Sequence, residues 1–346
     1  MATTVLGLDI GTKFIKYVEL DQMGKGRYQL LSYGMAPAPV KGINSEVSID
    51  QESLAVTIKK LLAEGHVRTH KVNLALPEAN VFTRIIQVPP LSERELASAI
   101  KWEAEQYIPL PLSEVQMDFS IVGESRDAQS NKKFDVLLVA APTNMIARYS
   151  KIMQMCDLET MSIETEIIAA SRALLPPVMD KPITVMVVNI GAQTTDFSII
   201  KSGVISFTRT LPTGGMSFTK VLAQDLALPP NQAEEYKKTY GLKEDQLEGK
   251  VARSLKPVFQ VILEEIKRSI VFFQNKFPEE IVSTIILSGG SAKMPGIVES
   301  IVKEIGLETQ VGNPWLRIER NSQNFLRIDE EGPMFVVAVG LAMRET

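Results

Sequence analysis

Two short segments in different halves of the chain share one layout, and this repeat constrains the fold more than any other feature. Each has an apolar strand, a polar turn that contains glycine, and a second β-rich run, and they span Leu6–Leu20 and Val187–Ile200. A polar glycine turn between two β-rich runs predicts a β-hairpin. Three pairs superpose at one constant offset, namely Asp9 with Asn189, Ile10 with Ile190, and Gly11 with Gly191. The repeat therefore predicts a duplicated α/β fold.

The first of these turns carries residue types that suit phosphate. Gly11 lets the backbone approach a ligand closely, Thr12 and Lys13 offer donors, and Asp9 places a carboxylate at the end of its strand. Backbone N–H groups in such a turn can hold phosphate, and a carboxylate beside phosphate commonly serves a hydrated Mg²⁺. One such motif fits an ordinary hairpin turn equally well. Two of them, each opening a similar half, predict two domains that close over one nucleotide.

Composition excludes several classes of protein. The 346 residues are enough for two domains, and 45% hydrophobic with 23% charged residues is typical of a globular protein. A net charge of −4 gives no basic field for nucleic acid or anionic lipid. The single cysteine, Cys156, excludes an internal disulfide framework. Because no signal peptide and no membrane-spanning apolar run is evident, we expect a cytoplasmic protein without direct membrane insertion.

A proline pair and a helix-capping motif predict the domain organisation. Pro89-Pro90 is followed by a capping box at Ser92-Glu93-Arg94-Glu95, where a differently built segment begins. We expect a first domain at 1–90 plus 159–182, with a small α/β subdomain inserted at 91–158. The second domain is expected at 183–346, with 213–275 as its helical subdomain.

Five motifs in a fixed order give the chain a family resemblance. They are LDIGTK, NIGAQTTD, PTGG, EEIKR and LSGGSAKMPG. Their order and spacing resemble the actin-like ATPase superfamily, which includes actin, heat-shock chaperones, sugar kinases and the cell-division protein FtsA. The resemblance implies an α/β fold of the actin-like (ribonuclease H-like) type, duplicated into two domains, with an FtsA-type small α/β inserted subdomain. It also implies ATP or ADP, with Mg²⁺, as the ligand.

The same resemblance assigns roles to individual residues. Glu164 falls where the chaperones keep a water-orienting glutamate, and Asp196 is the second catalytic candidate. Asp9 and Asp196 are the expected metal ligands. The expected nucleotide contacts are Asp9, Gly11, Thr12, Lys13, Asn189, Gly191, Gln193, Thr194, Thr195, Gly214, Gly215, Glu264, Lys267, Gly289, Gly290, Ser291 and Met294.

One departure from the superfamily pattern bears on activity. Many members have aspartate at the start of the second phosphate loop, where this chain has Asn189. A missing carboxylate removes one acceptor that would orient metal-bound or attacking water. Asp9, Asp196 and Glu164 remain, so we expect tight ATP binding and slow turnover, which makes the protein at most a weak ATPase.

Longer segments are similar to one branch of the superfamily, the PilM family of type IV pilus assembly. These are the first hairpin, the run Ser92–Pro109, NIGAQTTDFSI and LSGGSAKMPGI. The resemblance implies a protein at the cytoplasmic side of the inner membrane that is recruited by the N-terminal tail of PilN and relays nucleotide state to the assembly motors. We place the groove for that tail between the first half and the insert, with Leu96 and Ile100 as contacts. Simple packing in the subdomain core explains these two residues equally well.

Three other functions stay open from the sequence. A small-molecule kinase of the same superfamily would need a catalytic aspartate facing a substrate pocket, together with a sugar-binding insert. An FtsA-like filament former in cell division would self-associate in an ATP-dependent way. The third is a purely structural pseudo-ATPase whose cleft binds no nucleotide.

Overall fold

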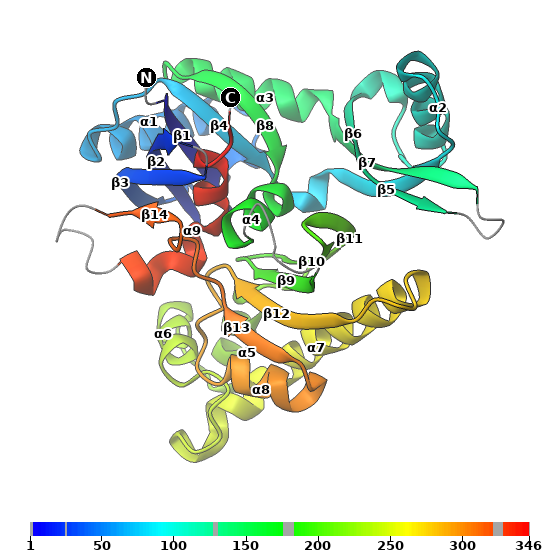
Figure 1. The fold of residues 1–346 in the computed structure, drawn as a ribbon. Coiled ribbons are helices and arrows are strands. Elements are labelled where there is room, and N and C mark those ends of the chain that lie inside the picture. Colours follow the sequence, from blue (N-terminus) through cyan, green and yellow to red (C-terminus); the bar gives the residue numbers. More distant parts are fainter. Residues whose placement is uncertain (1–2, 25, 127–130, 176–182, 321–327, 346) are drawn as a thin grey trace.

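Three β-sheets organise the fold (Figure 1). The computed structural model describes residues 3–24, 26–126, 131–175, 183–320 and 328–345. A six-stranded sheet runs in the order β14-β3-β2-β1-β4-β8, a five-stranded sheet in the order β11-β10-β9-β12-β13, and a three-stranded sheet in the order β5-β7-β6. The first two sheets belong to two α/β domains, and the third forms a subdomain that projects to one side.

The first domain is built on the six-stranded sheet with helices on both faces. Its strands are β1 (Thr3–Ile10), β2 (Phe14–Gly24), β3 (Arg27–Pro37), β4 (Lys71–Leu76), β8 (Glu159–Thr165) and β14 (Ile318–Glu319). One face packs its alternate apolar residues on α1 (Ser48–Glu64) and α3 (Thr143–Met155). The other face packs on α4 (Glu166–Leu174) and α9 (Ile328–Ala342).

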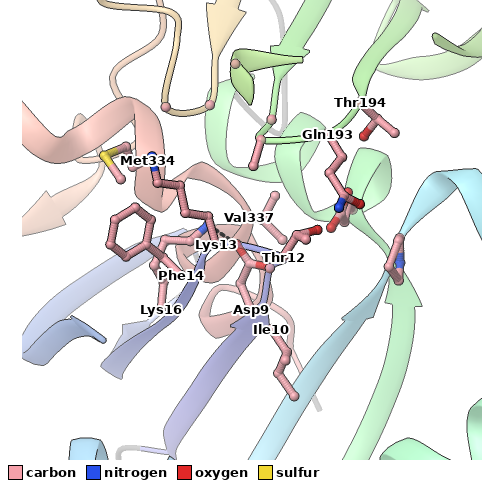
Figure 2. A pocket seen from close by; sticks show the side chains of 18 of the residues that line it. Asp9, Ile10, Thr12, Lys13, Phe14, Lys16, Gln193, Thr194, Met334 and Val337 are labelled. Carbon is pink, nitrogen blue, oxygen red and sulfur yellow. Dashed lines mark hydrogen bonds and ion pairs between the residues drawn. The ribbon is translucent and has the colours of Figure 1, made fainter. Parts of the chain in front are cut away.

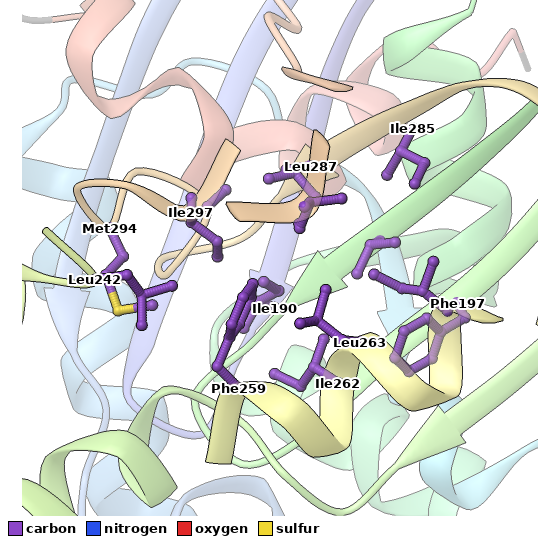
Figure 3. Packing of buried hydrophobic residues seen from close by; sticks show 14 of the residues in the cluster. Ile190, Phe197, Leu242, Phe259, Ile262, Leu263, Ile285, Leu287, Met294 and Ile297 are labelled. Carbon is purple, nitrogen blue, oxygen red and sulfur yellow. The ribbon is translucent and has the colours of Figure 1, made fainter. Parts of the chain in front are cut away.

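The second domain repeats this plan on the five-stranded sheet. Its strands are β9 (Thr184–Ile190), β10 (Thr195–Lys201), β11 (Val204–Leu211), β12 (Val282–Ser288) and β13 (Glu308–Val311). Four helices follow or separate these strands, namely α5 (Gly215–Asp225), α6 (Pro230–Tyr240), α7 (Lys250–Lys276) and α8 (Ile297–Ile305). Figure 3 shows α7 residues such as Phe259 and Leu263 meeting the sheet residues Ile190 and Leu287 in one apolar cluster.

The side subdomain consists of β5 (Phe82–Val88), β6 (Val115–Arg126), β7 (Lys132–Pro142) and α2 (Glu93–Glu105). Four single 3₁₀ turns complete the described secondary structure, at η1 (Gly42–Asn44), η2 (Glu78–Asn80), η3 (Leu112–Glu114) and η4 (Leu247–Gly249). None of the helices in the described part of the chain combines the length and the hydropathy needed to cross a bilayer.

The sheet topology places three segments in other domains than those predicted. Strand β5, expected in the first domain, pairs with β7 in the subdomain, whereas α3, expected in the insert, packs in the core of the first domain. The C-terminal segment, expected in the second domain, returns to the first, where β14 pairs with β3 and α9 packs on β1. The predicted boundary at 182/183 adjoins residues 176–182, which lie outside the described residues.

Both predicted hairpins are present, and their turns share one equivalent backbone hydrogen bond. Gly11 N donates to Phe14 O at 3.1 Å, and Gly191 N donates to Thr194 O at 2.9 Å. Strands β1 and β2 are antiparallel, as are β9 and β10. The repeat seen in the sequence is therefore a repeat of hydrogen bonding in the structure.

Helix α9 approaches β1 and α4 so closely that only glycine fits at two contacts. A Cβ at Gly7 would lie 2.1 Å from Ala338 O, and a Cβ at Gly340 would lie 1.8 Å from Ala169 O. Both obstacles are backbone atoms, which cannot rotate away. The glycines thus set how closely the C-terminal helix seats on the first domain.

We predict that Gly340→Ala lowers the free energy of unfolding by about 1–3 kcal/mol or more, because overpacking forces backbone shifts. Urea denaturation followed by circular dichroism measures the change. Gly123→Ala is the matched control, since its Cβ would meet only the Asp135 side chain, at the ordinary distance of 3.7 Å. Equal stability of the two variants would contradict the account of α9 packing.

Candidate functional site

A cavity of about 680 Å³ lies between the two domains, and it is called the large cavity below. Figure 2 shows side chains of the first hairpin, among them Asp9 and Lys13, and of the second hairpin, Gln193 and Thr194, lining the same space. The remaining wall comes from the end of β3 and the loop after it, η1, the segment around η2, the first residue of α4, helices α5 and α6, the loop after β12, and α9. The two hairpins thus face each other across one cavity.

Most of the predicted nucleotide contacts line the large cavity. They are Asp9, Gly11, Thr12, Lys13, Asn189, Gly191, Gln193, Thr194, Gly215, Gly289, Gly290 and Ser291, and Asp196 joins them. Five others do not line it, among them Glu264 and Lys267, which are described below. Thr195 is buried and donates its hydroxyl to Thr213 O at 2.7 Å, Gly214 is the N-cap residue of α5, and Met294 packs in the core of the second domain.

Glycines allow the loops around the cavity to converge. A Cβ at Gly215 would lie 2.6 Å from Ser291 Oγ, and a Cβ at Gly289 would lie 2.5 Å from Ile190 O. At Gly290, by contrast, a Cβ would meet no atom within 4 Å, so it would project into open space. The loop after β12 therefore leaves backbone exposed to whatever occupies the cavity.

Three of the carboxylates that line the large cavity are Asp9 and Asp196, which are buried, and Glu166, which is half-buried. Asp9 forms an ion pair with Lys16, while Asp196 accepts hydrogen bonds from Thr210 Oγ1 at 2.7 Å and from Asn189. Burial raises the pKa of Asp196 to about 6. Burial and the charges of Asp196 and Asp9 raise the pKa of Glu166 well above its ordinary value. The cavity therefore favours protons or other cations.

The charges occupy corresponding but exchanged positions in the two hairpins. In the first hairpin, Asp9 of β1 lies directly opposite Lys16 of β2. At the corresponding position of the second hairpin, Asn189 of β9 lies opposite Asp196 of β10. The carboxylate missing from Asn189 is thus present on the neighbouring strand. The position of this carboxylate follows from the pairing of β9 with β10, whereas the three aligned pairs of turn residues cover only the first strand and the turn of each hairpin.

The structure does not place Glu164, the predicted catalytic glutamate, in the large cavity. Its carboxylate does not line the cavity but forms ion pairs with Arg172, at 2.5 Å, and with Arg344, at 2.7 Å. Glu166, at the start of α4, lines the cavity instead. Residues i and i+2 of a continuous strand would share a face, but β8 ends at Thr165 and Glu166 begins α4, so the two glutamates reach different surroundings. The sequence IETE offered both candidates, and only the end of β8 separates them.

Glu264 and Lys267, the nucleotide contacts predicted on α7, also lie away from the large cavity. Both lie on the exposed side of α7, where Glu264 pairs with Arg268 and Lys267 pairs with Glu304, and neither lines the cavity. Helix α6 repeats the same spacing with Glu234 and Lys237. Glu234 and Lys238 line the large cavity. The chain therefore contains this spacing twice, and the copy on α6 is the one that borders the large cavity.

Glu234 is the centre of a polar network that joins the two domains. It accepts hydrogen bonds from Thr219 at 2.6 Å and Lys237 at 2.9 Å, and it forms an ion pair with Lys13 of the first hairpin at 3.2 Å. Although burial alone would raise its pKa, the hydrogen bonds from Thr219 and Lys237 lower the pKa of Glu234 to about 2. The carboxylate is therefore ionised, and its ion pair with Lys13 links the second domain to the first hairpin.

The expected contacts on α2 lie in a core. Leu96 and Ile100 are 3% and 1% exposed and pack with Ile86, Val136 and Leu138. They therefore line no surface groove, because the sheet of the subdomain covers the apolar face of α2.

A second cavity, of about 280 Å³, lies where the first domain, the subdomain and the second domain meet, and it is called the small cavity below. It is lined by Glu78, Ala79, Val81, Phe82, Thr83, Arg84, Tyr107, Ile108, Leu138, Thr208, Arg209 and Thr210. The ring of Tyr107 lies 3.9 Å from the Arg84 guanidinium, and burial raises the pKa of Glu78 to about 7. Sequence reasoning located this junction but not its residues.

Comparison with known families decides what the chain is. A profile described as type IV pilus assembly protein PilM matches residues 7–346. The chain belongs to the PilM family. The family prediction is confirmed, and so is the α/β actin-like fold.

Known structures and relatives agree with this assignment. A chain of a solved PilM–PilN type IV pilus biogenesis complex is 28% identical, with a TM-score of 0.83 and 98% of both chains covered. MreB5 of Spiroplasma citri, solved with AMPPNP, shares the fold at 15% identity, a TM-score of 0.53, and 97% and 94% coverage of the two chains.

Among curated proteins, the matches include the cell-division protein FtsA. FtsA of Neisseria meningitidis is 26% identical over 60% of this chain, and that match spans 53% of the FtsA protein. FtsA of Pseudomonas aeruginosa is 24% identical, with 98% of this chain and 88% of the FtsA protein covered. The PilM-family chain is thus related to FtsA along nearly its whole length.

The buried carboxylates predict how stability depends on pH. The pKa of Asp196 is higher in the folded protein than in the unfolded chain, so its stabilising contribution is complete below about pH 4 and is lost as the pH rises through about 6. We predict that Asp196→Asn raises the free energy of unfolding at pH 7 by about 1–3 kcal/mol, since one pKa unit corresponds to about 1.4 kcal/mol. The difference in the free energy of unfolding between variant and wild type should become smaller towards pH 4.

Chemical denaturation of wild type and variant at pH 4, 5, 6 and 7 measures this effect. The exposed Asp245→Asn, also on the second domain, is the matched control and should change stability little at any pH. A destabilised Asp196→Asn variant at pH 7 would contradict the assigned cost of burying the charged carboxylate.

Proposed function

We propose that this PilM-family protein is an ATP-binding scaffold of the type IV pilus inner-membrane assembly complex, with slow or no hydrolysis of its own. In this proposal it lies at the cytoplasmic face of the inner membrane and is recruited by the N-terminal tail of PilN. The proposal of ATP binding is supported by the large cavity, where two matching hairpins from two domains face each other.

The donor set of the large cavity suits a nucleotide with a divalent cation. A volume of about 680 Å³ falls within the range of small-molecule sites. Lys13, Lys16 and Lys238 supply positive charge for phosphates, and Gly290 leaves room for close approach of the backbone. MreB5, which shares the fold, was solved with the ATP analogue AMPPNP. Phosphate contacts are thus proposed at the two hairpin turns and at Gly289–Ser291.

Asp9 and Asp196 are the proposed ligands of Mg²⁺. In nucleotide sites this ion takes one or two carboxylates together with phosphate oxygens and water. Across the described ranges, no group of three or more His, Cys, Asp or Glu side chains is close enough to hold a metal. Bound Mg²⁺ would neutralise phosphate charge. Glu234 and Lys238 are proposed for the ribose and adenine side, in place of the pair on α7.

The proposal of slow ATP turnover is based on the contacts and the protonation of the carboxylates in the large cavity. Asp9 is already paired with Lys16, and Asp196 is held by Thr210 and Asn189. Glu166, the one carboxylate at the start of α4 that lines the cavity, has a raised pKa and holds its proton more tightly than an ordinary glutamate. A protonated carboxyl is a poor acceptor for the proton of an attacking water.

We predict that Glu234→Ala weakens ATP binding at least about 10-fold, whereas Glu264→Ala leaves it unchanged. The two glutamates begin motifs of equal spacing on α6 and α7, but only Glu234 lines the cavity. Fluorescence titration with a labelled ATP analogue in Mg²⁺ measures both affinities. The opposite ranking would return the nucleotide site to α7.

The nucleotide found in freshly purified protein tests the proposal directly. We expect bound ATP in wild type and none in Asp9→Ala, because the variant removes a proposed metal ligand. ADP alone, or rapid hydrolysis of added ATP by the pure protein, would contradict slow turnover. Wild type that neither contains nor binds nucleotide would leave only a structural pseudo-ATPase.

The small cavity is the proposed place for the PilN tail. It lies between the first domain and the subdomain, and its wall combines apolar side chains with Arg84 and Arg209. At its inner side, Oε2 of the buried Glu78 has no hydrogen-bond partner within the described residues. An extended peptide that carries apolar side chains and one donor suits these groups. The related PilM–PilN complex supports PilN as the source of that peptide.

We predict that Tyr107→Ala weakens binding of a synthetic peptide from the PilN N-terminus by about 10-fold or more, since buried aromatic contacts dominate such interfaces. Isothermal titration calorimetry measures the affinity. Trp102→Ala is the matched control, because Trp102 lies on α2, is 75% exposed, and does not line the small cavity. Weakening by Trp102→Ala but not by Tyr107→Ala would move the tail to another face of the subdomain.

A further inference from the structure

The loop between β3 and α1 forms part of the rim of the large cavity, and it is held at both ends. At its start, Ala38 N donates to Lys13 O at 3.0 Å, which places the loop beside the turn of the first hairpin. Further along, Arg148 Nη1 donates to Ile43 O at 3.3 Å. Residues 40–45 line the large cavity. The middle of the loop therefore lies between two fixed points, next to a proposed phosphate contact.

The middle of this loop is exposed to solvent although it lines the cavity. Val40 is fully exposed, and the side chain of Lys41 is 64% exposed. Gly42 has a φ of +47°, a conformation that favours glycine, and a Cβ at this position would meet no atom within 4 Å. The space around this turn and the exposure of Lys41 allow the lysine side chain to change its conformation.

Lys41 differs from the other lysines of the first domain that line the cavity in the position of its ion-pair partner. Lys13 and Lys16 pair with carboxylates that line the cavity themselves. Lys41 Nζ lies 3.3 Å from Asp50 Oδ2, and Asp50 does not belong to the lining. Lys41 can therefore bring positive charge to a ligand without leaving a carboxylate of the cavity unpaired.

Asp50 keeps other stabilising contacts when Lys41 leaves it. Ser45 Oγ donates to Asp50 Oδ2 at 2.5 Å, and this hydrogen bond is the main cause that lowers the pKa of Asp50. Asp50 also lies in the first turn of α1, where the helix dipole favours negative charge. An ion pair as exposed as that between Lys41 and Asp50 contributes little to stability. Exchange of Asp50 for a ligand oxygen therefore costs little free energy.

The terminal phosphate of a nucleoside triphosphate is the ligand group that most needs such a lysine. It adds negative charge to a cavity that is already lined by Asp9, Glu166 and Asp196. Because Lys13 and Lys16 are paired with carboxylates of the same cavity, the added charge needs a further cation. A lysine ammonium group binds phosphate as a point charge.

We propose that Lys41 leaves Asp50 to bind the terminal phosphate of a nucleoside triphosphate in the large cavity, and that it thereby distinguishes the triphosphate from the diphosphate. With the diphosphate bound, Lys41 keeps its ion pair with Asp50. With the triphosphate bound, the loop presents Lys41 to the terminal phosphate beside the turn of the first hairpin. This inference rests on the proposed nucleotide site, and it adds the group by which that site recognises the third phosphate.

The test measures the affinities for AMPPNP and for ADP, each with Mg²⁺, by isothermal titration calorimetry. For each protein, the Kd for ADP is divided by the Kd for AMPPNP. We expect Lys41→Gln to lower this ratio about 10-fold relative to wild type, because AMPPNP loses a charge-assisted contact that ADP does not make. Lys41→Arg keeps the positive charge, and its ratio should stay within about 3-fold of that of wild type.

Lys60→Gln is the matched control for loss of an exposed lysine. Lys60 lies on α1, has a side chain that is 75% exposed, pairs with Glu64 at 3.8 Å and does not line the cavity, so the ratio should not change. Asp50→Asn tests the exchange of partners. It weakens the hold on Lys41, while the amide oxygen can still accept a hydrogen bond from Ser45. We expect its ratio to equal that of wild type or to exceed it.

Equal weakening of AMPPNP and ADP binding by Lys41→Gln, or weakening of neither, would overturn the role of Lys41 and leave the proposed nucleotide site intact. A ratio as low in Lys41→Arg as in Lys41→Gln would overturn recognition by charge. A lowered ratio in Asp50→Asn would overturn the exchange of partners, because Lys41 would then act from within its pair with Asp50. Wild type that binds neither nucleotide would overturn the proposed function together with this inference.

Discussion

Three carboxylates in one buried cavity, Asp9, Glu166 and Asp196, are the constraint on which the rest of the site depends. Like charges at this depth repel each other, and the chain offsets the cost with one ion pair, two neutral donors and raised pKa values. The hairpin register places Lys16 opposite Asp9 and Asn189 opposite Asp196, so each hairpin carries one carboxylate and one group that stabilises it. The cavity is therefore prepared for a cation that completes the charge balance.

Features of the fold and the site are predictable from the sequence where they depend on residues that are close together in the chain. The two hairpins were predictable because turn, glycine and strand lie next to each other in the chain. The motif on α7 was misassigned because a glutamate and a lysine three residues apart occur on α6 as well, and only packing decides which helix faces the cavity. Glu164 was misassigned because a shift of two residues at the end of β8 separates the structural glutamate from the one in the cavity.

Long-range contacts account for the remaining differences. Nothing local indicates that β14 and α9, at the end of the chain, join the sheet that begins it. The pairing of β5 with β7 rather than with the first sheet is likewise decided by tertiary packing. The fold class was predictable because the repeated motifs belong to a known superfamily, whereas domain limits depend on which sheet each strand enters.

The return of α9 also bears on how the protein is made. Phe335 and Val339 of α9 complete the core of the first domain, and Met334 and Val337 line the large cavity. During synthesis, the first domain therefore emerges early from the ribosome but lacks a central helix until residues 328–342 have followed. Until then, this apolar face of its sheet lacks the cover of α9, and the cavity lacks the wall that α9 supplies. The N-terminal domain is thus the first to be synthesised, and it cannot finish folding before the second domain is complete.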